Sequence, residues 1–500
     1  MNRSERRARE RQQAKAATAL RKGADGVGSA SEAFEIAQDL FRHGKARDAL
    51  PGLRRAAAAY PDNGDLRGAL AYALAASGDF AGGIEQYRAL LRNDPDAVPV
   101  LTNLAFLLAK TGSVDEALKH LERASRLAPD HANTAFALAE LLAFRKRKDE
   151  AFNQYRQAAR LFQMKIGPSP RLEHCDDLIK LATALMWTGD LGPGLYCLDK
   201  AVELRPDHAL AHARRGLTLG RLRQYREAAA SLKRAAEIEP TLTEVRRALG
   251  DMLLASGDAA AAEKYYAEAV TSNPDDKLAR YFLAATRHES PDAPPPVYVE
   301  NLFNGYALTF EHHLVDVLQY RAPEQVVSAL LDLAGAAATN WSVVDLGCGT
   351  GLCGPLIRPA ARQLVGVDLS AGMLDKAREK AVYDDLKLGD VVEVLRGYVD
   401  AFDLALCTDV MIYLGNLTPI FAAAATALKP GAWFAFTTEI HDGEGFVLDT
   451  TGRYLHSHGY VESVAASHGF SVLQFESIVA RYQGLKPDYH HLYIARRGSA

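Results

Sequence analysis

A repeat of 34 residues constrains the fold of this 500-residue chain more than any other feature of its sequence. Prolines recur at this spacing in two series of three, and the gap between the series holds one further unit with nine extra residues. Seventeen residues before each proline lies a position that is usually glycine, which suits a tight turn. Self-similarity at this period is typical of stacked helix-turn-helix units. The turn positions of seven predicted units are Gly44, Gly78, Gly112, Lys146, Gly189, Arg223 and Gly257.

Side-chain sizes recur in the same frame. Small residues stand where the two helices of a unit must approach each other, and a larger residue fills the remaining space. The eleventh place of every unit is a leucine: Leu40, Leu74, Leu108, Leu142, Leu185, Leu219 and Leu253. The first small positions are Ala37, Ala71, Ala105, Ala139, Ala182, Gly216 and Gly250, and the second are Ala49, Gly83, Ala117, Ala151, Gly194, Ala228 and Ala262. The large positions are Leu53, Tyr87, Leu121, Tyr155, Leu198, Leu232 and Tyr266.

This pattern resembles the tetratricopeptide repeat (TPR) family. The resemblance implies an all-α TPR solenoid of about seven helix-turn-helix repeats over residues 29–288, with a concave groove lined by the first helix of each unit. Such grooves commonly hold extended peptides, so we expect a protein or peptide partner there, with Asn103 and Asn133 as candidates for hydrogen bonds to a peptide backbone. The alternative is a scaffold that holds the protein's own domains or subunits apart.

Charge and cysteine content exclude several classes of partner. A net charge of -4 gives no reason to expect nucleic acid, although residues 1–28 form a basic tail that we predict to be disordered. Five cysteines are scattered without a CxxC pair, so we expect neither a metal site nor a disulfide framework. No apolar stretch approaches the roughly 20 residues of a membrane span, and the N-terminus does not resemble a secretory signal. We therefore expect a cytoplasmic protein with no membrane partner.

The sequence changes character at a proline-rich stretch, residues 289–300, which we predict to be an extended linker. Because 500 residues exceed what one hydrophobic core supports, a second domain is expected, over residues 301–498. There, strand-like and helix-like segments alternate, which predicts a mainly parallel sheet with helices on both faces. The predicted strands cover residues 342–346, 363–367, 391–395, 402–407, 433–438, 471–478 and 491–495.

The first predicted strand runs into three alternating glycines, Gly347, Gly349 and Gly351. Glycines allow a turn to approach a ligand closely, and the helix that follows offers free backbone N–H groups. A dinucleotide-binding turn has the spacing GxGxxG, but Leu352 stands where its third glycine belongs. The spacing therefore disfavours a nucleotide-dependent oxidoreductase.

Four acidic residues lie near the ends of successive predicted strands. Asp345 lies near the end of the first strand, and Asp368 follows the second, 23 residues later. An acid at that distance binds ribose hydroxyls in doubly wound sheets, because a carboxylate accepts hydrogen bonds from both. Asp390 precedes the third predicted strand, and Asp409 follows the fourth. We expect these carboxylates to meet in the crevice at the carboxyl ends of the strands.

Together, the glycine turn and the acids resemble the class I S-adenosylmethionine (SAM)-dependent methyltransferases. The resemblance implies a Rossmann-like, seven-stranded α/β domain with SAM as its cofactor. It implies that Asp345 helps to hold the cofactor's amino group, that Asp368 binds the ribose and that Asp390 binds the adenine. The cofactor-binding residues it implies are Asp345, Gly347, Cys348, Gly349, Gly351, Asp368, Leu369, Asp390, Val391 and Asp409.

Methyl transfer from a sulfonium is a direct displacement, so the enzyme mainly holds the reacting groups in line, and no metal is expected. A general base is needed only when the acceptor begins protonated. The segment 301–318 is expected to form a lid, and Tyr306 and His313 on it to line the active site. The candidate catalytic residues are Tyr306, His313, Asp409, Tyr413 and His456.

The acceptor stays open between small molecules, proteins and lipid-like compounds. The Asn-Pro-Pro-Tyr signature of enzymes that methylate amino groups of nucleobases or glutamine is absent after the fourth strand, where Cys407-Thr408-Asp409-Val410 stands. We therefore expect a SAM-dependent methyltransferase whose repeats recruit a protein partner or substrate. The alternative is a non-catalytic TPR scaffold or binding protein with a degenerate SAM-sensing domain.

Overall fold

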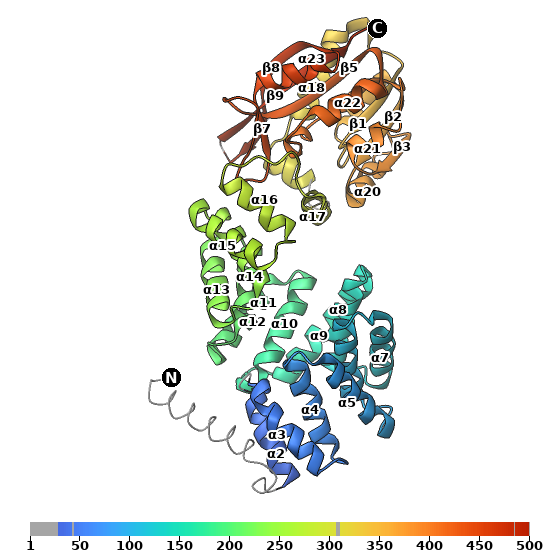
Figure 1. Ribbon diagram of the computed structural model, residues 1–500. Helices are drawn as coiled ribbons and strands as arrows, with labels where there is room; N and C mark the ends of the chain where they lie inside the picture. The colour runs from blue at the N-terminus through green and yellow to red at the C-terminus, as the bar shows by residue number, and fades with distance from the viewer. Residues whose placement is uncertain (1–28, 43–44, 307–310, 485, 500) are drawn as a thin grey trace. The chain divides into compact units, whose positions relative to one another are not determined.

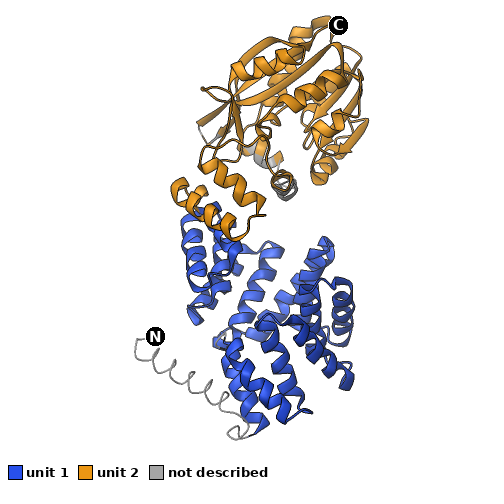
Figure 2. Cartoon of the chain, in the orientation of Figure 1, with its two compact units in different colours: residues 1–252 blue, residues 253–500 orange. Residues whose placement is uncertain are grey.

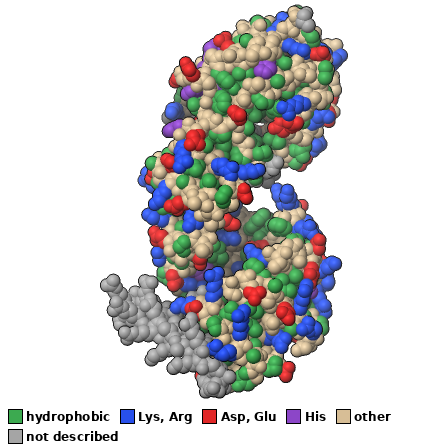
Figure 3. Space-filling model, in the orientation of Figure 1, with side chains coloured by type: hydrophobic (Ala, Val, Ile, Leu, Met, Phe, Trp, Pro, Cys, Tyr) green, Lys and Arg blue, Asp and Glu red, His purple; other side chains and the backbone are tan. Residues whose placement is uncertain are grey.

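The computed structural model describes residues 29–42, 45–306, 311–484 and 486–499. The chain forms two compact units, Met1–Met252 and Leu253–Ala500 (Figure 2). Within the described residues, unit 1 consists of helices, whereas unit 2 adds a large β-sheet (Figure 1). Lys, Arg, Asp and Glu side chains are interspersed over the visible surface (Figure 3). The predicted basic tail, residues 1–28, lies outside the described residues.

Consecutive helix pairs follow one another along the chain, as the 34-residue repeat predicts. Seven described pairs run from α2 to α15, and α16 (Lys277–Thr286) closes the series. In order, the helices are α2 (Ala30–Arg42), α3 (Ala46–Ala59), α4 (Gly64–Ala76), α5 (Phe80–Asn93), α6 (Val98–Lys110), α7 (Val114–Leu127), α8 (Ala132–Phe144), α9 (Lys148–Ile166), α10 (Cys175–Thr188), α11 (Leu191–Leu204), α12 (Ala209–Arg221), α13 (Tyr225–Ile238), α14 (Thr243–Ala255) and α15 (Ala259–Ser272). The nine extra residues lengthen α9 and form the short 3-10 helix η1 (Leu172–His174).

The turn inside the pairs has the left-handed backbone that its glycines predict. Even the two residues that replace glycine, Lys146 and Arg223, have φ angles of 60° and 59°. Gly44 lies outside the described residues. The remaining turn positions have φ between 88° and 92°: Gly78, Gly112, Gly189 and Gly257.

The small positions mark where paired helices touch. A Cβ built on Gly216 would lie 2.6 Å from Cγ of Leu232 and 3.0 Å from the carbonyl oxygen of Ala228. The leucines at the eleventh place are buried, except for the partly buried Leu253. The repeat frame predicted from the sequence therefore describes the packing of the helices.

Unit 2 begins before the predicted linker, because α15 and α16 belong to it. The hydroxyl of Tyr281 on α16 donates a hydrogen bond to the carbonyl oxygen of Gly452 at 3.1 Å, and the Tyr281 ring contacts the ring of Tyr298. Within the proline-rich stretch, the hydroxyl of Ser290 accepts a hydrogen bond from the N–H of Leu448. The prediction of an extended spacer over residues 289–300 is thus wrong: the stretch packs against the sheet domain.

The described part of unit 2 contains a nine-stranded sheet. Five parallel strands lie in the order β3-β2-β1-β4-β5, β9 pairs antiparallel with β5, and β8 pairs antiparallel with β9. A short hairpin of β6 and β7 is added at the end of β5. The strands are β1 (Trp341–Leu346), β2 (Ala361–Asp368), β3 (Asp385–Leu388), β4 (Phe402–Cys407), β5 (Leu428–Ile440), β6 (Phe446–Leu448), β7 (Tyr454–His456), β8 (Phe470–Gln483) and β9 (Lys486–Arg497).

The predicted fold class, a helical repeat array followed by a Rossmann-like α/β domain, is confirmed, but one predicted strand is wrong. Residues 391–395 form the short helix α21 (Val391–Leu395). Asp390 caps this helix, because its Oδ1 accepts hydrogen bonds from the N–H groups of Val392 and Glu393. A capped first turn outweighs the strand preference of the valines. The third strand is β3, which precedes Asp390.

Helices cover both faces of the sheet, and strand residues alternate between the two cores. Val344 and Leu346 pack with α21, α22 and α23, whereas Val343 packs with α18 and α19. Asp345 therefore points to the α18 and α19 face.

Among the described helices, none has the length and apolar character of a membrane span. The remaining helices of unit 2 are α17 (Pro296–Tyr306), the π-helix η2 (His312–Val317), α18 (Ala322–Ala334), η3 (Gly335–Ala337), α19 (Cys353–Ile357), η4 (Arg358–Ala360), α20 (Ala371–Glu379), η5 (Met411–Tyr413), α22 (Thr418–Ala427) and α23 (His458–Ser467).

Candidate active site

The glycine turn follows β1 and lies against the end of β2. Gly347, Gly349 and Gly351 have φ angles of 65°, 55° and 86°, a region that only glycine adopts readily. A Cβ built on Gly347 would lie 2.2 Å from Cγ2 of Val410, so a larger residue would have to displace the Val410 side chain. The N–H of Cys348 donates a hydrogen bond to the carbonyl oxygen of Val367 at 2.9 Å, which fixes the turn to β2.

Asp345, the penultimate residue of β1, is almost completely buried, with 1% of its surface exposed. Its Oδ2 accepts a hydrogen bond from the hydroxyl of Tyr383 at 2.7 Å. Burial raises the pKa of Asp345 to about 7, opposed by the Tyr383 hydrogen bond and reinforced by Asp368. A buried carboxylate of this kind favours a cationic partner, because a second charge offsets the loss of hydration.

Asp368 ends β2 and links it to the glycine turn. Its Oδ2 accepts a hydrogen bond from the N–H of Gly349 at 2.9 Å, and its Oδ1 accepts one from the N–H of Ser370 at 2.8 Å. Burial raises the pKa of Asp368, and these N–H groups oppose the rise. A carboxylate has about four acceptor sites, so acceptor capacity remains for a ligand hydroxyl. The next residue, Leu369, is partly exposed.

Asp390 and Val391 follow β3, which lies beside β2. The side chain of Asp390 is partly exposed while it caps α21, and Val391 is buried. Because β1, β2 and β3 are parallel neighbours, their acids Asp345, Asp368 and Asp390 stand at the same edge of the sheet. If residues 391–395 formed a strand, as predicted, Asp390 would stand at the amino end of that strand and not at the carboxyl edge of the sheet.

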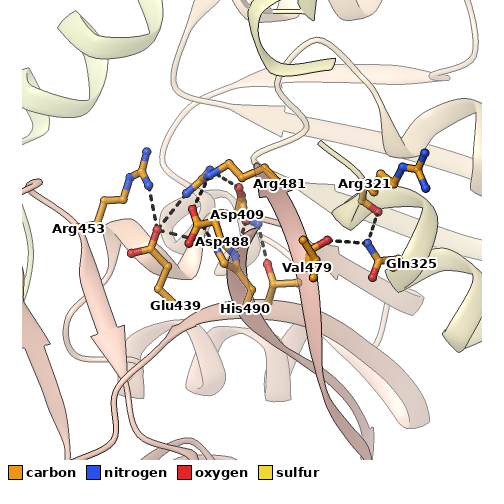
Figure 4. Close-up of polar contacts among 10 residues, drawn as sticks. Arg321, Gln325, Asp409, Glu439, Arg453, Val479, Arg481, Asp488 and His490 are labelled. Atoms are coloured by element: carbon orange, nitrogen blue, oxygen red, sulfur yellow. Dashed lines mark hydrogen bonds and ion pairs between the residues drawn. The ribbon is translucent and has the colours of Figure 1, made fainter. Parts of the chain in front are cut away.

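Asp409 belongs to a different environment, a partly buried ionic cluster around the buried side chains of Arg481 and His490 (Figure 4). It follows β4 in the left-handed conformation, with φ of 56°. Its Oδ2 lies 3.0 Å from Nη1 of Arg481, and its Oδ1 lies 3.0 Å from Nδ1 of His490. Both carboxylate oxygens thus lie at ion-pair distance from basic groups of the protein, and the predicted contact of Asp409 with cofactor and substrate stays a prediction.

The ionic cluster contains three acids and three basic groups: Asp409, Glu439, Asp488, Arg453, Arg481 and His490. The guanidinium of Arg481 bridges the acids, at 3.0 Å from Glu439 and 2.8 Å from Asp488. Burial lowers the pKa of His490, but Asp409 and Asp488 outweigh burial and raise it to about 9. Burial raises the pKa of Asp409, but His490 and Arg481 outweigh it and hold that pKa well below its usual range.

Three members of the ionic cluster also have the spacing of metal ligands. The ligand atoms of Glu439, Asp488 and His490 lie within 4.8 Å of one another. However, the guanidinium of Arg481 already contacts both carboxylates. With His490 protonated, the three positive groups balance the three acids, so the cluster needs no added cation for neutrality. The absence of a metal from the reaction stays a prediction.

Two further candidates have described surroundings. Tyr413 ends η5, and its ring contacts the ring of Phe303 on α17, with centroids 5.4 Å apart. His456 is fully buried, and its Nε2 lies 2.8 Å from the carbonyl oxygen of Leu414. Burial lowers the pKa of His456 to about 4. His456 therefore anchors the turn after η5, and its predicted catalytic role stays a prediction.

The predicted lid is only partly described. Residues 307–310, and the side chains of Tyr306 and His313, lie outside the described residues, so their predicted roles stay predictions. Glu311 is described, and its Oε1 accepts hydrogen bonds from Oγ1 of Thr350 at 2.9 Å and from Nζ of Lys380. The segment before β1 is thereby tied to the glycine turn. Glu311 was not predicted from the sequence, although its partner Thr350 lies within the glycine motif.

Comparisons with known proteins match both parts of the chain. Residues 344–434 match a family model described as a methyltransferase domain, and residues 34–98, 96–164 and 221–286 match models described as tetratricopeptide repeats. A ubiquinone biosynthesis O-methyltransferase from Xanthomonas oryzae pv. oryzae is 31% identical over 130 residues, which are 25% of this chain and 52% of that protein. The chain thus spans about half the length of that relative.

Two other proteins are similar to a part of this chain, and the matched part differs in length between them. The biotin biosynthesis bifunctional protein BioHC from Teredinibacter turnerae is 31% identical over 135 residues, 24% of this chain and 23% of that protein. The crystal structure of magnesium protoporphyrin IX methyltransferase from Synechocystis PCC 6803 with bound SAH is 18% identical, with a TM-score of 0.33. The match covers 41% of this chain and 100% of that chain.

Proposed function

We propose that this chain, which joins tetratricopeptide repeats to a methyltransferase domain, is an enzyme that transfers a methyl group from SAM to an acceptor. One observation supports the proposal most. The glycine turn and three carboxylates, Asp345, Asp368 and Asp390, stand together at the carboxyl edge of β1, β2 and β3. This edge is where doubly wound sheets bind their ligands.

The donor set fits the chemistry of SAM. SAM offers a cationic amino group, a ribose diol and an exocyclic adenine amino group, and each of them donates hydrogen bonds to a carboxylate. Asp345 would hold the amino group, Asp368 the ribose and Asp390 the adenine, with Val391 against the ring. The glycine turn leaves its backbone accessible to the methionine part of the ligand.

SAM, when bound, supplies an electrophilic methyl group. The residues of the chain then hold the ligand in one orientation, which is the main source of acceleration in a direct displacement. Buried apolar neighbours of the site, such as Val391 and Met411, exclude water. Tyr413 and the segment after β4 would face the acceptor, and Tyr306 and His313 would line the pocket on the lid.

Loss of the Asp368 carboxylate should weaken cofactor binding. Titration calorimetry with SAM and with S-adenosylhomocysteine should show binding to the wild-type protein and at least about tenfold weaker binding to Asp368→Ala, because a hydrogen bond to a charged group is lost. The matched control is Asp375→Ala on α20, an exposed acid paired with Arg378, which should bind as the wild type does. The proposal fails if the wild-type protein binds neither ligand.

The repeat groove would recruit a protein or peptide that carries the acceptor. On first helices of the repeats, Nζ of Lys180 donates a hydrogen bond to Oδ1 of Asn133 at 2.6 Å, and Asn103 is exposed. These polar groups suit the backbone of an extended peptide.

Transfer of labelled methyl groups to proteins of a cell extract should therefore depend on this groove. In the full-length chain, Asn133→Ala combined with Lys180→Ala should lower protein labelling by about tenfold, because two donors to the peptide are lost. Its affinity for SAM should not change. Lys119→Ala, an exposed residue on the second helix of a repeat, serves as the control. Equal labelling by all three proteins would argue against recruitment by the groove.

A further inference from the structure

Tyr383 reaches into the candidate active site from an unexpected place. It lies in the turn between α20 and β3, whereas its hydrogen-bond partner Asp345 lies near the end of β1. The hydroxyl of Tyr383 donates to Oδ2 of Asp345 at 2.7 Å. The ring of Tyr383 packs into the core between the sheet, α18 and α19. Neither the sequence motifs nor the proposed function assigns a role to Tyr383.

Three glycines make the slot that holds the Tyr383 ring. A Cβ built on Gly351, Gly354 or Gly366 would lie 2.9 Å, 2.8 Å or 3.0 Å from a carbon of that ring. Gly366 on β2 is the register partner of Asp345 on β1, so its missing side chain opens the space beside the carboxylate. The third glycine of the motif, expected to pack on the methionine part of the cofactor, thus also makes room for Tyr383.

The surroundings of Asp345 explain why a donor is needed there. The ionisable groups near it are Asp368 at the end of β2, the thiols of Cys348, Cys353 and Cys407, and Tyr383. Burial raises the pKa of each thiol above its ordinary value, so the thiols carry no charge at neutral pH. Asp368 is an acid and disfavours a second negative charge. Tyr383 is the group among them whose hydrogen bond favours the ionised form of Asp345.

We infer that Tyr383 is a positioning residue for cofactor binding: its hydroxyl favours the ionised form of Asp345 and aligns this carboxylate for the cationic amino group of SAM. This inference rests on the proposed function, in which Asp345 holds that group. Burial also raises the pKa of Tyr383 far above its ordinary value, so the phenol keeps its proton and always donates. The slot of glycines fixes the ring, and the ring fixes the direction of the O–H group.

Tyr383→Phe tests the inference, because it keeps the ring and removes the hydroxyl. At pH 6.5, calorimetry should show about tenfold weaker binding of SAM and of S-adenosylhomocysteine to this variant. The ratio of variant to wild-type Kd should shrink towards pH 9, since Asp345 is then ionised in both proteins. The amino group of each ligand titrates equally with both proteins, so the ratio reports on the protein. Binding of 5′-methylthioadenosine, which lacks the amino acid part, should not change.

Two further measurements separate positioning from a structural effect. In the Asp345→Asn background, Tyr383→Phe should leave the Kd for SAM and its pH profile unchanged, because no carboxylate remains to be ionised. If Tyr383→Phe fails to fold, Asp345→Asn alone should remove the protein's contribution to the pH dependence of SAM binding. A pH-independent ratio for Tyr383→Phe, or an equal loss of 5′-methylthioadenosine binding, would overturn the inference. Absence of SAM binding by the wild-type protein would instead overturn the proposed function.

Discussion

His490 has no exposed surface, yet its neighbours favour its charged form at neutral pH. Nδ1 lies 3.0 Å from Asp409, and Nε2 lies 3.9 Å from Asp488. In a medium of low dielectric constant, two nearby carboxylates stabilise an imidazolium more than burial destabilises it. The titration of His490 therefore makes the free energy of unfolding of the sheet domain depend on pH.

The stability of the native chain should fall as pH rises from 6.5 to about 9. The pKa of His490 is raised in the folded state, so its contribution is complete below the unfolded pKa of 6.5 and is lost as pH passes about 9. A rise of this size corresponds to about 3 kcal/mol. Urea unfolding at pH 6.5, 7.5 and 9 measures the effect. His490→Gln should be less stable at pH 6.5 and lack this part of the pH dependence; an unchanged dependence would exclude His490 as its source.

At the scale of single residues, the sequence predicted the glycine turn and its acids but not the ionic cluster or Tyr383. Asp345, Asp368 and the glycine turn were recognisable because they lie on short motifs next to a strand. The ionic cluster was not, because its members lie between residues 409 and 490 and meet only when β4, β5, β8 and β9 pair. Tyr383 was missed for the same reason, since nothing in its local sequence points to Asp345.

At the scale of helices and strands, periodic elements were predictable and short ones were not. The repeat helices follow from a frame that recurs seven times, whereas α21 was taken for a strand because the helix cap of Asp390 outweighs its valines. The hairpin of β6 and β7 was missed, since each strand has only three residues. The stability of such a hairpin comes from its neighbours, Tyr281 and Ser290 among them.

Helix pairing in the array should be sensitive to a single methyl group at Gly216. Gly216→Ala places a carbon against Leu232 and the backbone of Ala228, and should lower the free energy of unfolding by about 1–3 kcal/mol. Gly192→Ala on α11 is the matched control: a Cβ there has open space, and alanine favours the helix by up to about 1 kcal/mol. Chemical denaturation of both variants measures the difference. Equal effects at the two positions would show that close packing does not explain Gly216.

At the scale of the whole molecule, the chain divides before α15 and not at the proline-rich stretch. The helix α16 and residues 289–300 bury aromatic surface of the sheet domain, including Tyr454, which contacts Tyr281. A sheet domain that starts after this stretch would leave that surface in water. The domain boundary that keeps this aromatic surface covered is therefore the one between the two compact units, before Leu253.

A fragment starting at Leu253 should be more stable than one starting at Asn301. Loss of the Tyr281 and Ser290 contacts should lower the melting temperature of the shorter fragment by at least about 5 °C, since about 2 kcal/mol corresponds to such a shift in a domain of this size. Calorimetric melting of the two fragments provides the comparison. Equal melting temperatures would mean that α16 contributes nothing to the sheet domain.

Gly452 and Arg453 are neighbours in sequence with different partners: Gly452 receives the Tyr281 hydrogen bond, and Arg453 pairs with Glu439 of the ionic cluster. Because α16 contacts Gly452, a genetic exchange of one repeat array for another must keep α16 together with the sheet domain. A crossover upstream of residue 253 would deliver the methyltransferase domain together with the helices that support Gly452. A crossover between α16 and β1 would have to replace Tyr281 with an equally fitting residue in the same event.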